Sequence, residues 1–383
     1  MTTRIEELLS DNANLTRDVL GAGAAAIDRE RRFPKENLNV LGDRGLLGLL
    51  VPTAYGGAGG DLAEMSAVLE QMAQGCASTA MVVMMHYCGM AVLAAKGSAK
   101  LKQSVLPEIA RGRHLTTLAF SEQGSGGHFY APISQLRAMG EGFVLNANKS
   151  FVTSGAEADS YVVSTRTSDA RGPQDLDLFL VSRGIAGVEI SGQFEGLGLA
   201  GNASGPMKFN DVALDAETRI GEKGSGFPTM LEVVLPHFQI GSAAVSVGIA
   251  GTAFERTVTH VTSRKYQHAN QTALAQIPRV QYLVAEMAIE LRAIRAYLHQ
   301  TIRKAVSGEA DAMLDVLAVK AKASEACLAV VSRAMTLGGG AAFGRRGGLE
   351  RIFRDAQAAA VMAPASDVLK DFIGKAALGL PLF

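Results

Sequence analysis

The chain has 383 residues, of which 48% are hydrophobic, so it can bury a large core in one domain or in two to three packed units. Its 37 basic and 37 acidic residues balance, which removes the electrostatic case for a nucleic-acid or anionic-membrane partner. Three cysteines, an odd number, suit a reducing cytoplasm, and the longest apolar run is shorter than the ~18 residues of a membrane span. We therefore expect a cytoplasmic protein without a membrane partner.

Helical, strand-like and again helical patterns follow one another along the chain. Residues 1–113 carry apolar side chains at helical spacing, interrupted by the glycine-rich loop "PTAYGGAGGD". Residues 114–225 hold short alternating or β-branched runs between turn residues, which predict about seven strands. Residues 226–383 return to long helical segments, which predict a bundle. These segments lie at about 229–264, 277–306, 311–337 and 365–378.

This order predicts an α+β protein with an N-terminal α-helical domain, a central antiparallel β-barrel-like domain and a C-terminal four-helix bundle. Because strands do not alternate with helices, the pattern argues against a doubly wound parallel sheet. The stretch "LGAGAAAID" contains Gly-x-Gly-x-x-Ala, but no strand precedes it, so it predicts a small-residue helix contact rather than a dinucleotide loop. The seven histidines show no ligand spacing, and we expect no metal.

Five stretches, in chain order, carry more specific information. They are "LGDRGLLGLLVPTAYGGAG", "LAFSEQGSGG", "FVLNANKSFVTSGAEADSYVVSTR", "MKFNDVAL" followed by "IGEKGSGF", and "AMTLGGGAAF" followed by "LERIFRDA". Together they resemble the acyl-CoA dehydrogenase family of flavoproteins over nearly the whole chain. The resemblance implies that family's fold, FAD as cofactor, and a thioester substrate carried by CoA or by a carrier protein. It also implies a homo-oligomer, a dimer or a tetramer, formed through the C-terminal bundle.

The second and third stretches supply most of the flavin contacts that the resemblance implies. Ser121 stands where the family places a hydroxyl against the flavin ring, Thr153 keeps a second hydroxyl, and Phe151 replaces a tryptophan. Gly127 replaces the serine of the motif, so one phosphate-directed hydroxyl is lost, although the N–H groups of a glycine turn also bind phosphate. A flat apolar slot with polar groups at one edge suits a flavin. The implied FAD contacts are Leu118, Phe120, Ser121, Gly126, Gly127, Phe151, Thr153, Arg264, Thr336, Gly339, Gly340 and Asp367.

The adenine end of the implied FAD site departs from the family pattern. Arg264 matches, but the Phe-Gly pair that follows it in the family is Gln-His here. Thr336 replaces a glutamine, while Gly339 and Gly340 are kept. Because the family builds this end with a loop of a neighbouring subunit, these residues again imply an oligomer.

The carboxylate that the family uses as a base is absent from both of its usual positions. In the family it takes the α-proton of the acyl thioester while a hydride goes to the flavin. The position before the last helix holds Ala363, and the one on the first bundle helix holds Phe238, followed by Gln239 in place of arginine. Phe238, Gln239 and Ala363 are the implied substrate contacts. Removing a positioned base typically costs a factor of ~10²–10⁴ in rate.

Three explanations of the missing carboxylate stay open at this point. A substitute base can come from Asp367, four residues past Ala363, or from His237, although one helical position turns a side chain by about 100° from Phe238. Alternatively the enzyme is a flavin-dependent oxygenase, of the monooxygenase or dioxygenase type, which uses O2 and needs no base. Ala363 and Phe238 would then widen and dry the pocket for a bulky or aromatic thioester. The third explanation is a catalytically inactive protein that keeps the fold, against which the retained Ser121 and Thr153 argue.

Overall fold

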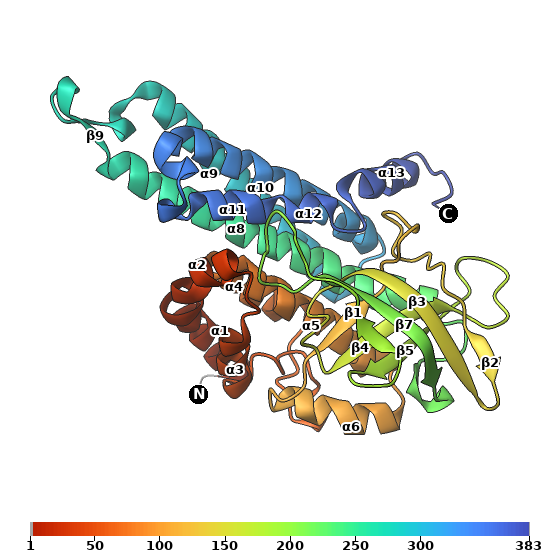
Figure 1. Ribbon diagram of the computed structural model, residues 1–383. Coiled ribbons are helices and arrows are strands. Elements are labelled where there is room, and N and C mark those ends of the chain that lie inside the picture. Colours follow the sequence, from red (N-terminus) through yellow and green to blue (C-terminus); the bar gives the residue numbers. More distant parts are fainter. Residues whose placement is uncertain (1–2, 383) are drawn as a thin grey trace.

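The computed structural model describes residues 3–382 and confirms the order of helices, strands and helices (Figure 1). The N-terminal helices are α1 (Arg4–Leu15), α2 (Gly21–Glu30), α3 (Lys35–Asp43), α4 (Leu62–Gly75), α5 (Ala77–Lys96) and α6 (Ala99–Ala110). Helix α5 is buried along nearly its whole length, which explains why its sequence has no polar face. Helices α4 and α5 both pack on the long bundle helix α8 (Leu235–Ser263).

Two glycines of α8 permit this close packing. A Cβ atom on Gly248 would lie 2.2 Å from the carbonyl oxygen of Glu70 on α4, and one on Gly241 would lie 2.8 Å from Cγ of Met84 on α5. Both distances are shorter than a carbon can tolerate, so these two positions require a residue without a side chain. The N-terminal half of α8 is thereby packed closely against α5 at Gly241 and against α4 at Gly248.

The strands form two four-stranded sheets that do not close into a barrel. Their orders are β1-β4-β5-β8 and β2-β3-β7-β6. The strands are β1 (Thr116–Ala119), β2 (Arg137–Met139), β3 (Gly142–Val152), β4 (Ser160–Arg166), β5 (Leu176–Ser182), β6 (Val188–Ile190), β7 (Gly205–Leu214) and β8 (Arg219–Ile220). All pairs are antiparallel except β1 with β4, which is parallel. The chain passes through β2 and β3 of the other sheet between these two strands, and such a crossover allows β4 to return in the same direction.

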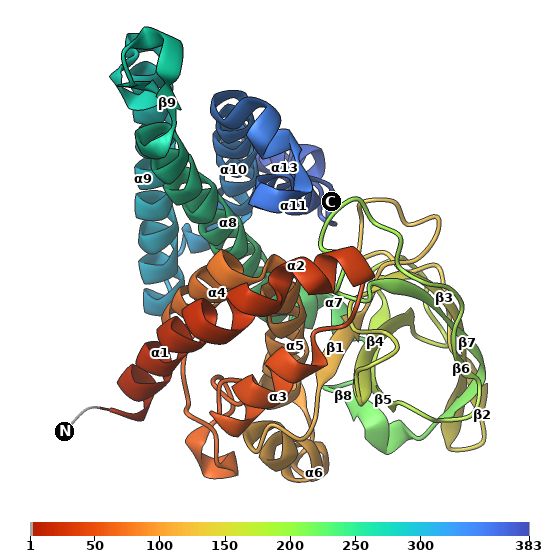
Figure 2. The ribbon, with the colours of Figure 1, turned by 60° about the vertical axis from the view of Figure 1, so that its left-hand side comes forward.

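The C-terminal part is a bundle in which the four predicted long helices correspond to α8, α9, α10 and α13. Its elements after α7 (Gly226–Thr229) and α8 are β9 (Lys265–Tyr266), β10 (Thr272–Ala273), α9 (Pro278–Ser307), α10 (Ala312–Phe343), α11 (Leu349–Ala356), α12 (Ala358–Val361) and α13 (Ser366–Ala377). The regular part of α10 ends at Gly339, which has φ 52° and ψ −138°, close to the predicted helix end. Figure 2 shows the β9–β10 hairpin at the end of the bundle that lies away from the two sheets.

Three helical stretches are long and apolar enough to span a membrane, judged by length and composition alone. They are Ala77–Lys96, Gly226–Ser263 and Ala312–Phe343. The protein itself buries 94% and 89% of the apolar window in the first two stretches, but 39% in the third. The hydropathy of α5 and α8 is therefore explained by the core, whereas α10 turns much of its apolar window outward. The absence of a membrane partner stays a prediction.

A buried ion pair joins the end of β1 to β3. Nζ of Lys149 lies 2.7 Å from Oε1 of Glu122, and it also donates to the carbonyl oxygen of Ser164 on β4 at 2.6 Å. Both side chains are almost fully buried, at 0% and 4% exposure. Oε2 of Glu122 accepts the N–H groups of Ile133 and Ser134. Burial raises the pKa of Glu122, but Lys149 and Ser134 outweigh it and hold this pKa below its usual value.

We expect Lys149→Met to destabilise the protein strongly, because it leaves the Glu122 carboxylate buried without its counter-charge. Breaking a buried pair in this way typically costs about 3–5 kcal/mol. Lys223→Met is the matched control, because Lys223 and its partner Asp169 are 53% and 66% exposed and such pairs contribute about 1 kcal/mol or less. Urea unfolding of the three proteins measures the difference. An unfolding midpoint of Lys149→Met equal to that of the control would contradict this expectation.

Candidate active site

A small cavity lies where the chain after β1, the first turn of α8 and the loop between α12 and α13 meet. It encloses about 50 Å³. Its lining brings together part of the predicted site, namely Leu118, Phe120, Ser121, Phe151, Phe238 and Ala363. The other lining residues are Met85, Phe129, Val234, Leu235 and Pro364. Segments that are up to about 280 residues apart in the sequence thus form one site, since Met85 and Pro364 both line it.

Each wall of the cavity is positioned by a different element. The strand β1 places Leu118, and the chain that follows it places Phe120, whose ring stacks on that of Phe129 with centroids 6.4 Å apart and an interplanar angle of 6°. Leu235 and Phe238 are three residues apart on α8, so a helix puts both on one face. The walls are therefore aromatic and aliphatic on three sides.

The cavity is lined almost entirely by apolar side chains. Ser121 is the one lining residue with a polar side chain in the described part of the chain. The ring of Phe238, which is 8% exposed, fills space that a smaller residue would leave open. That Ala363 and Phe238 widen and dry the pocket stays a prediction.

Two predicted residues lie beside the cavity without lining it. Thr153 is 7% exposed, and its Oγ1 is 2.7 Å from Oγ of Ser204, so its hydroxyl is already engaged. Gln239 is completely buried, and neither its Nε2 nor its Oε1 has a hydrogen-bond partner within residues 3–382. A buried amide without hydrogen-bond partners is unfavourable. No hydrogen bond within residues 3–382 explains why a glutamine stands at position 239.

The glycine turn of the implied phosphate segment lies near α13. Gly126 has φ 59°, and a Cβ atom there would contact nothing, so the turn is open to a ligand on this side. A Cβ atom on Gly127 would lie 3.1 Å from Cγ2 of Val368, so the serine of the family motif would crowd α13. His128, next in the chain, is 3.0 Å from the hydroxyl of Tyr130 and lies at the exposed turn.

None of the proposed substitute bases reaches the cavity in the described part of the chain. Nδ1 of His237 is 2.7 Å from the carbonyl oxygen of Val233, and burial lowers the pKa of this imidazole. Asp367 is exposed, and its Oδ1 accepts the N–H of Val368. Glu122, the acidic residue next to Ser121 in sequence, is held by Lys149. The cavity lining contains no carboxylate among residues 3–382.

The predicted adenine contacts lie at the other end of the bundle. Arg264 follows the last residue of α8, whose 29 residues at about 1.5 Å each place it roughly 40 Å from Leu235 at the cavity. Thr336, Gly339 and Gly340 are exposed near the end of α10. Arg256 on α8 donates to the carbonyl oxygen of Gly347, which shows that the ends of α8 and α10 are neighbours. Within one chain these residues are therefore not brought together with Ser121.

Sequence reasoning missed several side chains that shape the site. Lys149 lies inside a quoted motif, but its burial could not be read from the pattern. His86 on α5 fixes β1, because its Nδ1 accepts the N–H of Thr116 while its Nε2 is 3.1 Å from the carbonyl oxygen of Leu47. Burial lowers the pKa of His86 to about 4, so it acts as a neutral structural group.

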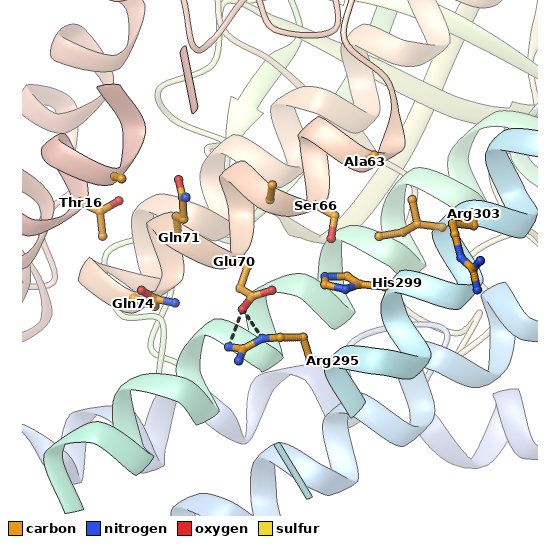
Figure 3. A pocket seen from close by; sticks show the side chains of 12 residues that line it. Thr16, Ala63, Ser66, Glu70, Gln71, Gln74, Arg295, His299 and Arg303 are labelled. Carbon is orange, nitrogen blue, oxygen red and sulfur yellow. Dashed lines mark hydrogen bonds and ion pairs between the residues drawn. The ribbon is translucent and has the colours of Figure 1, made fainter. Parts of the chain in front are cut away.

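A larger groove of about 640 Å³ lies between the N-terminal helices, α4 and α9 (Figure 3). Glu70 on α4 and Arg295 on α9 form an ion pair within it, with 2.7 Å between Nη2 and Oε1. His299, also on α9, faces the same space (Figure 3). The residues that line it in the described part of the chain include none of those predicted for the flavin or the substrate. Size alone therefore does not identify the site.

Comparison with known proteins decides the family. Three family models match in order: acyl-CoA dehydrogenase N-terminal domain over residues 3–113, middle domain over 117–212 and C-terminal domain over 224–378. The chain belongs to the acyl-CoA dehydrogenase family. It is 28% identical over 366 residues to cyclohex-1-ene-1-carbonyl-CoA dehydrogenase of Syntrophus aciditrophicus, which covers 95% of this chain and 87% of that protein.

Solved structures of the acyl-CoA dehydrogenase family share the fold. Butyryl-CoA dehydrogenase from Megasphaera elsdenii matches with a TM-score of 0.92 and 23% identity over 99% of both chains. The FAD complex of PigA matches with a TM-score of 0.91 and 21% identity over 99% of this chain and 98% of that one.

The protein is a flavin-dependent oxidoreductase that uses FAD. The residues at the cavity fit the flavin ring. Phe151 is 67% exposed and presents an aromatic face at the cavity rim, Ser121 offers a hydroxyl, and the turn at Gly126 is open. When bound, FAD supplies the acceptor of two electrons.

We expect His237→Gln and Asp367→Asn to keep thioester-dependent flavin reduction within about threefold of the wild-type rate, whereas loss of a true general base costs ~10²–10⁴-fold. The reason is that neither side chain reaches the cavity. Rapid mixing of each oxidised variant with an acyl thioester, followed by flavin absorbance, measures the rate. A loss of 100-fold or more in either variant would identify that residue as the base.

Proposed function

We propose that this enzyme oxidises an acyl thioester, carried by CoA or by a carrier protein, by α,β-dehydrogenation with a proton acceptor other than the family's carboxylate. One observation carries the proposal: the chain after β1, which holds the implied flavin contact Ser121, faces both family base positions, Phe238 and Ala363, across a single cavity. The relative from Syntrophus aciditrophicus, whose name gives a cyclic acyl-CoA as substrate, supports the substrate class.

The backbone of Ala363 offers a hydrogen-bond donor at the family's usual base position. Its N–H has no protein acceptor within residues 3–382, and the residue lines the cavity. A free N–H in an apolar wall can donate to the thioester carbonyl as negative charge develops on that oxygen. The side chains of Phe120, Phe129 and Phe238 exclude water around the acyl group and so strengthen this bond.

The α-proton needs another destination, because no lining side chain of the described residues is a carboxylate. We infer that a solvent water at the rim takes it. Ser121 is half-buried and Phe151 largely exposed, so this edge of the cavity reaches solvent. When bound, FAD would accept the two electrons of this oxidation as a hydride from the β-carbon, and the substrate would gain a carbon–carbon double bond.

The same missing carboxylate supports a second candidate, oxygenation of the thioester. That reaction inserts one oxygen atom of O2 into the substrate and reduces the other to water with two electrons from a reduced carrier. It needs a dry, apolar site and no base at the α-carbon, and the lining of the cavity meets both conditions.

An anaerobic experiment separates the two candidates. A panel of acyl-CoAs, from propionyl to octanoyl and including cyclic acids, is added to the oxidised enzyme, and flavin absorbance is followed. Bleaching without O2 is expected for a dehydrogenase. No bleaching, with turnover only when O2 and a reductant are present, would replace dehydrogenation by oxygenation. No response in either assay would contradict both.

We expect Phe238→Ala to shift the preference toward longer acyl groups, because it removes a ring from a cavity of about 50 Å³. Differences of one or two methylenes in a pocket are worth about 10–200-fold, so the octanoyl-to-butyryl ratio of kcat/KM should rise at least about 10-fold. Phe343→Ala is the control, since Phe343 is 81% exposed. An unchanged ratio in Phe238→Ala would show that the acyl chain lies elsewhere.

A further inference from the structure

A buried lysine lies directly behind the cavity wall that Ala363 forms. Lys320 on α10 is 0% exposed, and its Nζ donates to the carbonyl oxygens of Met362 at 2.9 Å and Pro364 at 2.7 Å. These two carbonyls flank Ala363 on either side. One side chain therefore holds both ends of the wall segment 362–364, at the position where the family keeps its catalytic residue.

The chemistry of Lys320 is unusual for a residue that only fills space. Its ammonium donates hydrogen bonds to two neutral carbonyls, and no carboxylate forms an ion pair with it among residues 3–382. Burying an ammonium in this way is unfavourable, and an apolar side chain would fill the same volume at a lower cost. A lysine is expected at this position if the site requires its two hydrogen bonds rather than its side-chain volume.

We propose that Lys320 is a positioning residue of this enzyme, which fixes residues 362–364 so that Ala363 and its free N–H keep their place beside the substrate carbonyl. The inference rests on the proposed function, because that function gives the N–H of Ala363 its role. Lys320 does not line the cavity, so it acts through the loop.

The charge of Lys320 makes this positioning sensitive to pH. Burial lowers its pKa to about 7, and Asp367 at the start of α13 is the charged group that opposes this shift. As the pH rises through this value the ammonium loses a proton, and the two carbonyl bonds lose their charge assistance. The loop is therefore held most firmly below pH 7, and the rate of flavin reduction should decline above it.

Lys320→Met tests the proposal in the FAD-bound enzyme, with Lys322→Met as a matched control on the same helix. Lys322 is 48% exposed and pairs with Glu290 at 3.3 Å. We expect Lys320→Met to lower the rate constant of anaerobic flavin reduction, per bound FAD, by about 10–100-fold, because small misplacements cost up to about 10²-fold. Its thioester Kd should change far less, and the control should stay within about twofold of wild type.

The conservative variant Lys320→Arg gives a second readout. Its guanidinium does not titrate near neutral pH, so it should recover part of the rate and lose the decline above pH 7. Equal rates per bound FAD in Lys320→Met and wild type, or equal losses in Lys320→Met and Lys322→Met, would overturn the proposal. If Lys320→Met fails to fold with FAD, Lys320→Gln, which keeps a donor, takes its place in the same comparison.

Hydrogen exchange separates failure of this inference from failure of the proposed function. If no thioester bleaches the wild-type flavin, the proposed function fails, and the exchange rate of the Met362 amide, which bonds to the carbonyl oxygen of Ala358 at 3.0 Å, still judges Lys320 in the FAD-bound proteins. We expect this rate to rise about tenfold in Lys320→Met, as for a loosened segment, and not in Lys322→Met. Equal exchange in all three proteins would overturn the positioning role.

Discussion

The geometry of the active site depends first on the buried contact between Lys149 and Glu122. It ties β3 to the chain that leaves β1, and Glu122 in turn holds residues 133 and 134 through their N–H groups. Ser121 precedes Glu122 directly, so the position of the hydroxyl beside the cavity is set by an ion pair from which water is excluded. The low exposure of both partners makes this contact stronger and less adaptable than a surface pair.

A second buried lysine plays the equivalent part on the opposite wall. Lys320 approaches the loop 362–364 from α10, as Lys149 approaches the β1 end from β3. Between these two walls lies the first turn of α8, which carries Phe238, and the next turn packs closely against α5 at Gly241. The cavity is thus formed by three segments with separate anchors, and the only polar side chain that lines it, within the part of the chain described here, is that of Ser121.

The sequence predicted the order of the elements well, because long amphipathic helices and short alternating strands have distinct periods. Through the family resemblance it also placed Ala363 and Phe238 at one site, counted from the quoted motifs, and both residues line the cavity. It could not predict the burial of Lys149 and Lys320, because lysine is almost always exposed and its exceptions depend on contacts distant in sequence. The parallel pairing of β1 with β4 likewise arises only when separate segments pack together.

The distance between Arg264 and the cavity follows from the unbroken length of α8, which the helix predicted at 229–264 already contained. The motif places Arg264 at an FAD site, whereas the fold places it at the far end of the bundle from Ser121. The resemblance assigns Ser121 and Arg264 to FAD binding, but a single chain keeps them far apart. We therefore predict that one copy of the chain supplies the residues around the flavin ring and that another copy supplies those around the adenine.

The alanine at position 363 also changes how the enzyme would respond to chemical attack. A reactive thioester analogue that forms a covalent bond with a carboxylate base has nothing to alkylate in a cavity whose described lining offers only one hydroxyl and hydrocarbon. The methyl group of Ala363 gives such a reagent no nucleophile to modify.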